Sequence, residues 1–136
     1  MIWSLLLVAM QPEGLPSCDK EKADQGIQQE MNICAANDFF IADQEMNAAW
    51  ALARAKMKEL DKSYADHPGP PEADLRSYFE ILLSAQRAWL KYRDEHCRLD
   101  GYRARGGSLE PLLVSTCKTV LTEARTKELR ELAETY

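Results

Sequence analysis

Four cysteines constrain the fold of this chain more than any other feature of its sequence. Cys18, Cys34, Cys97 and Cys117 occur in a chain of 136 residues that opens on a largely apolar run. An even number of cysteines in a short chain with such a start is typical of an exported protein held by two disulfides. We therefore expect a periplasmic or secreted protein. The alternative is that all four cysteines are reduced thiols packed in a core.

The first 16 residues have the character of a leader segment. Residues 2–10 are long enough for the central part of a signal peptide and too short to span a bilayer. No Lys or Arg precedes them and no clear cleavage site follows, so the start codon, the cleavage site and lipid anchoring stay open. We predict a leader over 1–16, a single domain over 17–136 and no stable membrane span.

The charge balance limits the kind of partner. The chain has 22 acidic residues against 17 Lys and Arg, a formal net charge of -5. An acidic protein is repelled by a phosphate backbone, so this balance argues against a nucleic acid as partner. It favours a basic partner, which we expect to be a protein.

Residues after Cys18 have the composition and the apolar spacing of helices. Ala, Leu, Glu, Lys, Arg, Gln and Met dominate. Between 25 and 65 apolar residues recur every three or four positions, among them Met46, Ala53 and Met57, and Asp24 is suited to cap this segment. The pattern fits one long helix or two helices with a kink near 37–38.

Two breaks divide the rest of the chain. The segment 67–71 contains three prolines and a glycine, and Pro71 suits the first turn of a second helix, whose pattern extends toward Arg105. The pair Gly106-Gly107 stops that helix, and Ser108 is a good N-cap for a third. The predicted fold is all-α, an antiparallel helical bundle of three to four helices stapled by two disulfides.

Spacing also favours one pairing of the cysteines among the three that are possible. Cys97 lies eight residues before Arg105 and Cys117 nine residues after Ser108. A hairpin folded about the glycines therefore brings these two cysteines level on adjacent helices, where a bridge needs Cα atoms within about 7 Å. Cys18 reaches Cys34 because extended residues 18–24 can fold back along about 15 Å of helix. Each bridge would stabilise the fold by about 3 kcal/mol.

Catalytic and metal-binding patterns are weak in this sequence. The two histidines are His67 in the proline-containing turn and His96 beside Cys97, without further ligands at the short spacing that a zinc site needs. Ser108 follows a glycine pair, but no strand precedes it and no base is placed near it. We predict no catalytic residues, no metal and no cofactor, and hence a protein that is not an enzyme.

One polar stripe stands out in the second helical region. Gln86, Trp89, Arg93 and Cys97 share one helix face. Because this stripe mixes Trp and Cys with polar residues, we expect it to be buried, and its polar groups then need partners. Asp43 is the candidate counter-charge for Arg93. The resulting polar core network of Asp43, Gln86 and Arg93 is either a fold-specifying ion pair or a partly open polar pocket beside Trp89.

Five spaced motifs occur together along the chain. They are Gln28-x-Glu-Met-Asn-x-Cys-Ala35, Ala42-Asp43-x-Glu-Met-Asn47, Ala85-Gln-Arg-Ala-Trp-Leu-x-Tyr-Arg-Asp94 followed by Cys97, Gly106-Gly-Ser108, and Cys117-x-x-x-Leu-Thr-x-x-Arg125. In this order they resemble the lysozyme inhibitor LprI-like family of bacterial envelope proteins, over residues 18–132. The resemblance implies an exported, all-helical, disulfide-containing domain and the inhibition of lysozyme, an activity known for few members. It implies no catalytic residues.

An inhibitor of this kind needs a rigid protruding element to block the enzyme's cleft, and two loops qualify, 64–71 and 102–108. The second offers as candidate partner-binding donors Arg103, Arg105, the amides of Gly106 and Gly107, and Ser108, which suit the paired carboxylates of a glycosidase cleft. Alternatively, its arginines are simply cations at a helix C-terminus. Animal lysozymes are strongly basic, so an acidic partner would be steered toward them.

The function predicted from the sequence is therefore an exported cell-envelope binding protein that inhibits peptidoglycan-cleaving lysozyme. The alternative is an envelope structural or interaction module without inhibitory activity, and a small enzyme of unknown reaction ranks third.

Overall fold

The computed structural model describes residues 15–136, so nearly all of the leader predicted over 1–16 lies outside the described residues. Within that range the chain forms helices and no strand. The helices are α1 (Lys20–Asp24), α2 (Gln28–Asp66), α3 (Tyr78–Gly101) and α4 (Glu110–Thr135), with a short 3-10 helix, η1 (Tyr102–Ala104), between α3 and α4. The predicted all-α bundle with two disulfides is confirmed.

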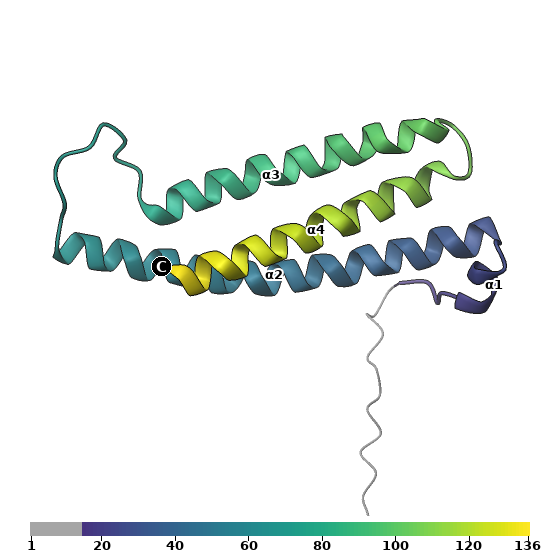
Figure 1. The fold of residues 1–136 in the computed structure, drawn as a ribbon, viewed down its shortest axis with the longest axis horizontal. Coiled ribbons are helices and arrows are strands. Elements are labelled where there is room, and N and C mark those ends of the chain that lie inside the picture. The colour runs from purple at the N-terminus through teal and green to yellow at the C-terminus, as the bar shows by residue number, and fades with distance from the viewer. Residues whose placement is uncertain (1–14) are drawn as a thin grey trace, which may run out of the picture.

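Three long helices lie side by side in an up-down-up order (Figure 1). α3 runs antiparallel to α2, and α4 returns in the direction of α2. The most extensive packing is between α2 and α4, which are not consecutive in the chain. The loop between α2 and α3 and the hairpin between α3 and α4 therefore stand at opposite ends of the bundle (Figure 1).

The first helical region is one continuous helix of 39 residues, without a break near 37–38. The expectation that Asp24 caps it was wrong, because residues 20–24 form the separate short helix α1, which Asp19 caps at the backbone N–H of Lys22. Gly26, with φ of 85°, then turns the chain into α2. The tertiary fold places α1 back against α2, and that arrangement is not encoded in the apolar spacing of either segment.

The second long helix begins later than predicted. Pro71 does not lie in its first turn, because residues 71–77 stay non-helical and α3 starts at Tyr78. Ser77 and Glu80 form a capping box there, in which each side chain accepts a hydrogen bond from the other residue's backbone N–H. This reciprocal cap satisfies two amides and is a stronger start signal than the proline.

The hairpin between α3 and α4 turns at the predicted glycines. α3 ends at Gly101 rather than near Arg105, and η1 continues the chain to Ala104. Gly106 has φ of 78°, a left-handed conformation that favours glycine. Ser108 is not the N-cap of α4 as predicted, since Leu109 takes that position without a side-chain hydrogen bond. Ser108 instead accepts, at its carbonyl, a 2.9 Å hydrogen bond from Asn32.

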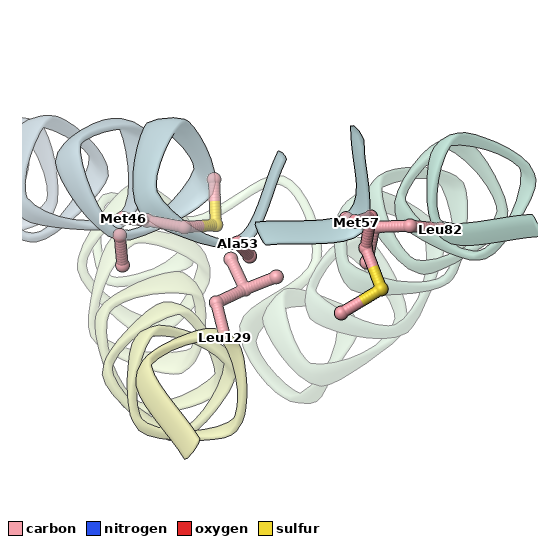
Figure 2. Packing of buried hydrophobic residues seen from close by; sticks show 6 residues of the cluster. Met46, Ala53, Met57, Leu82 and Leu129 are labelled. Carbon is pink, nitrogen blue, oxygen red and sulfur yellow. The ribbon is translucent and has the colours of Figure 1, made fainter. Parts of the chain in front are cut away.

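The apolar core is a narrow seam in which α2 contributes small and flexible side chains. Ala49, Ala53 and Leu129 are at most 1% exposed, and Met46, Met57 and Leu82 complete the cluster (Figure 2). Alanines at this spacing let α4 approach α2 closely, and methionines fill the irregular gaps. A core of this size leaves part of the stabilisation to other devices, and two disulfides supply it.

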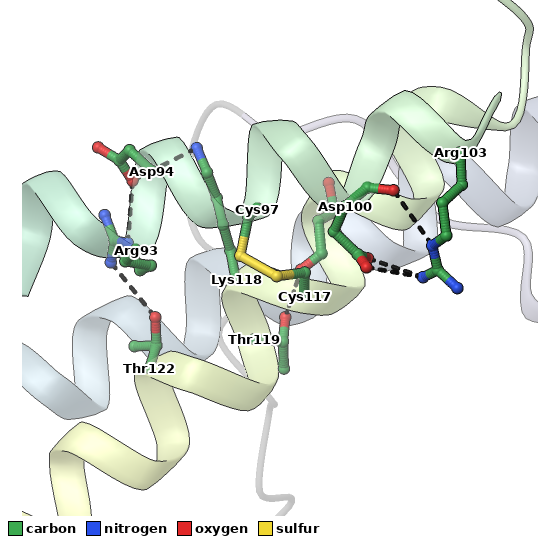
Figure 3. The surroundings of a disulfide bond; sticks show 10 residues. Arg93, Asp94, Cys97, Asp100, Arg103, Cys117, Lys118, Thr119 and Thr122 are labelled. Carbon is green, nitrogen blue, oxygen red and sulfur yellow. Dashed lines mark hydrogen bonds and ion pairs between the residues drawn. A yellow bond between two sulfur atoms is a disulfide. The ribbon is translucent and has the colours of Figure 1, made fainter. Parts of the chain in front are cut away.

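Both predicted disulfides are present. Cys18 and Cys34 tie the segment before α1 to α2, with a Cα–Cα distance of 5.0 Å. Cys97 and Cys117 join α3 to α4, with a Cα–Cα distance of 5.4 Å (Figure 3). The four cysteines are thus all paired, and the alternative of reduced core thiols is excluded in this structure.

Candidate functional site

Arg93 is the centre of a buried polar cluster between the three long helices. It is 7% exposed. Its Nη1 donates to Asp43 Oδ1 at 3.1 Å. The same Nη1 donates to Thr122 Oγ1 at 3.3 Å, and Nε donates to Asp94 Oδ1 at 3.0 Å (Figure 3). α2, α3 and α4 each contribute to this set, so the guanidinium fixes the three helices relative to one another.

Aromatic rings complete the surroundings of the Arg93 guanidinium. Its Cζ lies 5.1 Å from the centroid of the Phe39 ring and 5.3 Å from that of Trp89. A weakly hydrated, planar cation between ring faces gains cation–π attraction while its N–H groups stay paired. This arrangement reduces the penalty for burying the charge.

Gln86 belongs to a second set of contacts, about two turns before Arg93 on α3. Its Oε1 accepts a 3.0 Å hydrogen bond from Arg125 Nε, and its amide nitrogen lies 3.7 Å from Met46 Sδ. Arg125 also donates to Glu128 at 2.8 Å, and its Cζ lies 5.9 Å from the Trp89 ring. Gln86 is therefore linked to the Arg93 set through Arg125 and the Trp89 ring, over which both guanidinium groups lie.

Two members of this cluster, Thr122 and Arg125, were missing from the network predicted from sequence. Both lie in the motif that begins at Cys117, and the bridge to Cys97 brings that motif against α3. The sequence signal that could have identified them is their spacing from Cys117, because a helix bridged to α3 at Cys117 turns these positions toward α3. The burial of Arg93 and the pairing of its N–H groups favour the interpretation as a fold-specifying ion pair over an open polar pocket.

The hairpin end of the bundle holds the residues predicted to bind a partner, and most of its donors are already used. Arg103 is paired with Asp100 at 2.8 Å. The amide of Gly106 donates to Glu110 Oε2 at 2.6 Å, and that of Gly107 donates to the Ala104 carbonyl at 2.9 Å. Both glycine amides therefore already have partners within the hairpin, and their contact with a protein partner stays a prediction.

All five predicted hairpin residues are exposed, and the side chains of Arg105 and Ser108 make no hydrogen bond within residues 15–136. The Cζ of Arg105 lies 4.4 Å from the centroid of the Tyr102 ring, which orients the guanidinium at the surface. Ser108 is exposed beside it. The side chains of Arg105 and Ser108 are therefore the donors at the hairpin that remain available to a partner.

The opposite end of the bundle carries a cleft of about 500 Å³ between the ends of α2 and α3 and the loop that joins them. Leu75 stands at its edge and is 89% exposed. The apolar lining, which we call the loop surface, consists of Tyr64, Pro70, Pro71, Leu75, Tyr78 and Ile81.

Fold and geometry together define the class of this protein. It is an all-helical domain stapled by two disulfides, with a buried ion cluster that fixes the helices and exposed elements at both ends of the bundle. Among the described residues, no helix combines the length and the apolar character needed to cross a membrane.

Comparison with known proteins shows the family. The family described as "Lysozyme inhibitor LprI" matches residues 18–129, and the chain belongs to this family. The chain is also similar to an uncharacterized protein of Rhizobium meliloti (strain 1021), with 45% identity over 126 residues that cover 93% of this chain and 84% of the relative. No solved structure matches the chain at a significant level.

Proposed function

We propose that this protein is exported and binds and inhibits a peptidoglycan-cleaving lysozyme. The observation that carries the proposal is the family match over residues 18–129, which spans both disulfides and the buried ion cluster. Two disulfides suit a protein that works outside the cytoplasm. The similarity to the Rhizobium protein adds no activity, since that protein is itself uncharacterized.

Inhibition in this proposal is a matter of binding alone. The net charge of -5 steers the protein toward a basic enzyme. The bridges hold the helices before the partner arrives, so little conformational entropy is lost on binding. A pre-ordered end of the bundle then covers the enzyme's cleft and excludes the cell-wall polymer.

The test is lysozyme activity against cell walls, titrated with the purified, oxidised protein at low and at physiological salt. The proposal expects stoichiometric inhibition that weakens as salt screens the attraction. It also expects loss of inhibition after reduction of the disulfides. A folded and oxidised protein without effect at high micromolar concentration would contradict the proposal and favour an interaction module of the cell envelope.

Both ends of the bundle are candidates for the contact with lysozyme. At the hairpin, Arg105 and Ser108 remain available, and the combined variant Arg105→Glu with Ser108→Ala removes both. Loss of inhibition in that variant would assign the contact to the hairpin. Unchanged inhibition would direct attention to the opposite end.

A further inference from the structure

Leu75 is the most exposed of the large hydrophobic side chains in residues 15–136. Its exposed fraction is 89%, against 66% for Leu99 and 59% for Leu52. A single exposed leucine is ordinary on a protein surface. Leu75 differs because it lies at the edge of a cleft whose walls are largely apolar, so it belongs to a continuous patch.

The backbone on either side of Leu75 is held in place. Arg76 forms a bidentate ion pair with the Asp74 carboxylate, in which Nε donates at 3.0 and 3.1 Å and Nη2 donates at 2.6 Å. The Arg76 backbone N–H also donates to Asp74 at 3.0 Å. This clasp spans Leu75 and restrains the backbone that carries the leucine side chain.

The rest of the loop is stiff for a different reason. Three of its residues, Pro68, Pro70 and Pro71, have φ fixed by their rings. The capping box of α3 anchors the far end of the loop immediately after Arg76. An apolar side chain presented by such a loop loses little entropy when it is bound, which is the property of a binding anchor.

Charge separates the two ends of the bundle. Residues 61–81, which include the loop surface, contain five carboxylates against two Lys and Arg residues. Residues 98–110, which form the hairpin end, contain three arginines against two carboxylates. A basic enzyme is therefore attracted more strongly to the first end than to the second.

We propose that the loop surface is the element that enters the lysozyme cleft, with Leu75 as its apolar anchor. This inference rests on the function proposed above. The catalytic acid of a lysozyme lies in a hydrophobic pocket, so its cleft accepts an apolar side chain next to charged groups. The carboxylates around the loop surface complement the basic exterior of the enzyme.

The experiment compares variants of the full, oxidised chain in the lysozyme titration. Leu75→Ala removes the anchor, and the expected loss of inhibitory affinity is roughly 10- to 100-fold. Leu75→Asp weakens inhibition at least as much. Leu52→Ala is the matched control, since Leu52 is an exposed leucine on α2 away from both the loop and the hairpin, and it stays within about twofold of the wild type. Unchanged circular dichroism and melting temperature show that each variant is folded.

A second variant tests the clasp without touching the anchor. Arg76→Ala releases the Asp74 carboxylate and leaves Leu75 in place, so inhibition weakens by a smaller factor, on the order of several-fold, as the loop loses order. If the wild type inhibits lysozyme and Leu75→Ala inhibits equally well, the inference about the loop surface is overturned and the proposed function stands. If only the hairpin variant loses inhibition, the inference is likewise overturned and the proposed function stands. A wild-type protein that does not inhibit overturns both.

Discussion

Asp61 on α2 caps the N-terminus of α3 from the neighbouring helix. Its Oδ1 accepts a 2.7 Å hydrogen bond from the backbone N–H of Tyr78, and its Oδ2 accepts one of 3.2 Å from Phe79. The first amides of a helix have no partner within it, and the helix dipole there favours a negative charge. Asp61 therefore determines where α3 meets α2, and it also holds the base of the loop that carries Leu75.

Replacement of this carboxylate is expected to destabilise the protein. Asp61→Ala leaves the amides of Tyr78 and Phe79 to water and lowers the free energy of unfolding by about 1–2 kcal/mol. Urea denaturation measures the change. Asp66→Ala, an exposed carboxylate at the end of the same helix, serves as control and changes stability by less than about 0.5 kcal/mol. Equal effects of the two substitutions would contradict the capping role.

Loss of the buried guanidinium has a larger effect. Arg93→Ala leaves Asp43 and Thr122 without their partner between the helices and is expected to lower the free energy of unfolding by about 3–5 kcal/mol. The control is Arg103→Ala, which breaks an ion pair whose arginine side chain is 67% exposed, with an effect of at most about 1 kcal/mol. Chemical denaturation measures the free energy of unfolding of both variants. Equal losses would contradict the larger effect expected for the buried arginine.

α3 lies close against α4 at Gly101. A Cβ built on it would lie 2.5 Å from Val114 Cγ2 and 3.4 Å from the Glu110 carbonyl oxygen. An exposed helical glycine gains about 1 kcal/mol on replacement by alanine. Here the clash outweighs that gain, and Gly101→Ala is expected to destabilise by about 1–3 kcal/mol.

The clash at Gly101 has its own control. Val114→Ala creates room for the new methyl group, so the double variant is expected to be more stable than the sum of the single effects predicts. Thermal and urea denaturation of the wild type, the two single variants and the double variant give the interaction energy between positions 101 and 114. Strict additivity would show that α3 and α4 are not in tight contact at this position.

The clasp around Leu75 makes a prediction about pH. Hydrogen bonds from Arg76 lower the pKa of the Asp74 carboxyl to about 2. This pKa lies below the ordinary value of about 3.9, so the ion pair stabilises the folded loop fully at pH values above about 3.9. Its contribution decreases as pH drops below the ordinary pKa and is lost once pH has fallen through about 2. Carboxyl NMR is expected to show a titration midpoint near 2 in the wild type and a normal one in Arg76→Ala. A normal midpoint in both would show that the clasp does not form in solution.

Features set by local spacing were predictable from the sequence. The period of the α-helix places Met46, Ala53 and Met57 on one buried face, and the glycine pair at 106–107 brings Cys97 level with Cys117. The ion pair between Arg93 and Asp43 was also expected, since a buried stripe with an arginine needs a carboxylate from the facing helix.

Other features were decided by the tertiary structure alone. The start of α3 depends on Asp61, 17 residues away, as well as on its own capping box. The partner of Gln86 is Arg125, which α4 delivers only because it packs against both other long helices. The hairpin amides are occupied because Glu110 and the Ala104 carbonyl lie within hydrogen-bond distance once the chain has turned. Helix period and cysteine spacing are local properties, so the sequence alone determined them. The choice of hydrogen-bond partner depends on which distant groups the folded helices bring within about 3 Å, and only the packed bundle determines that.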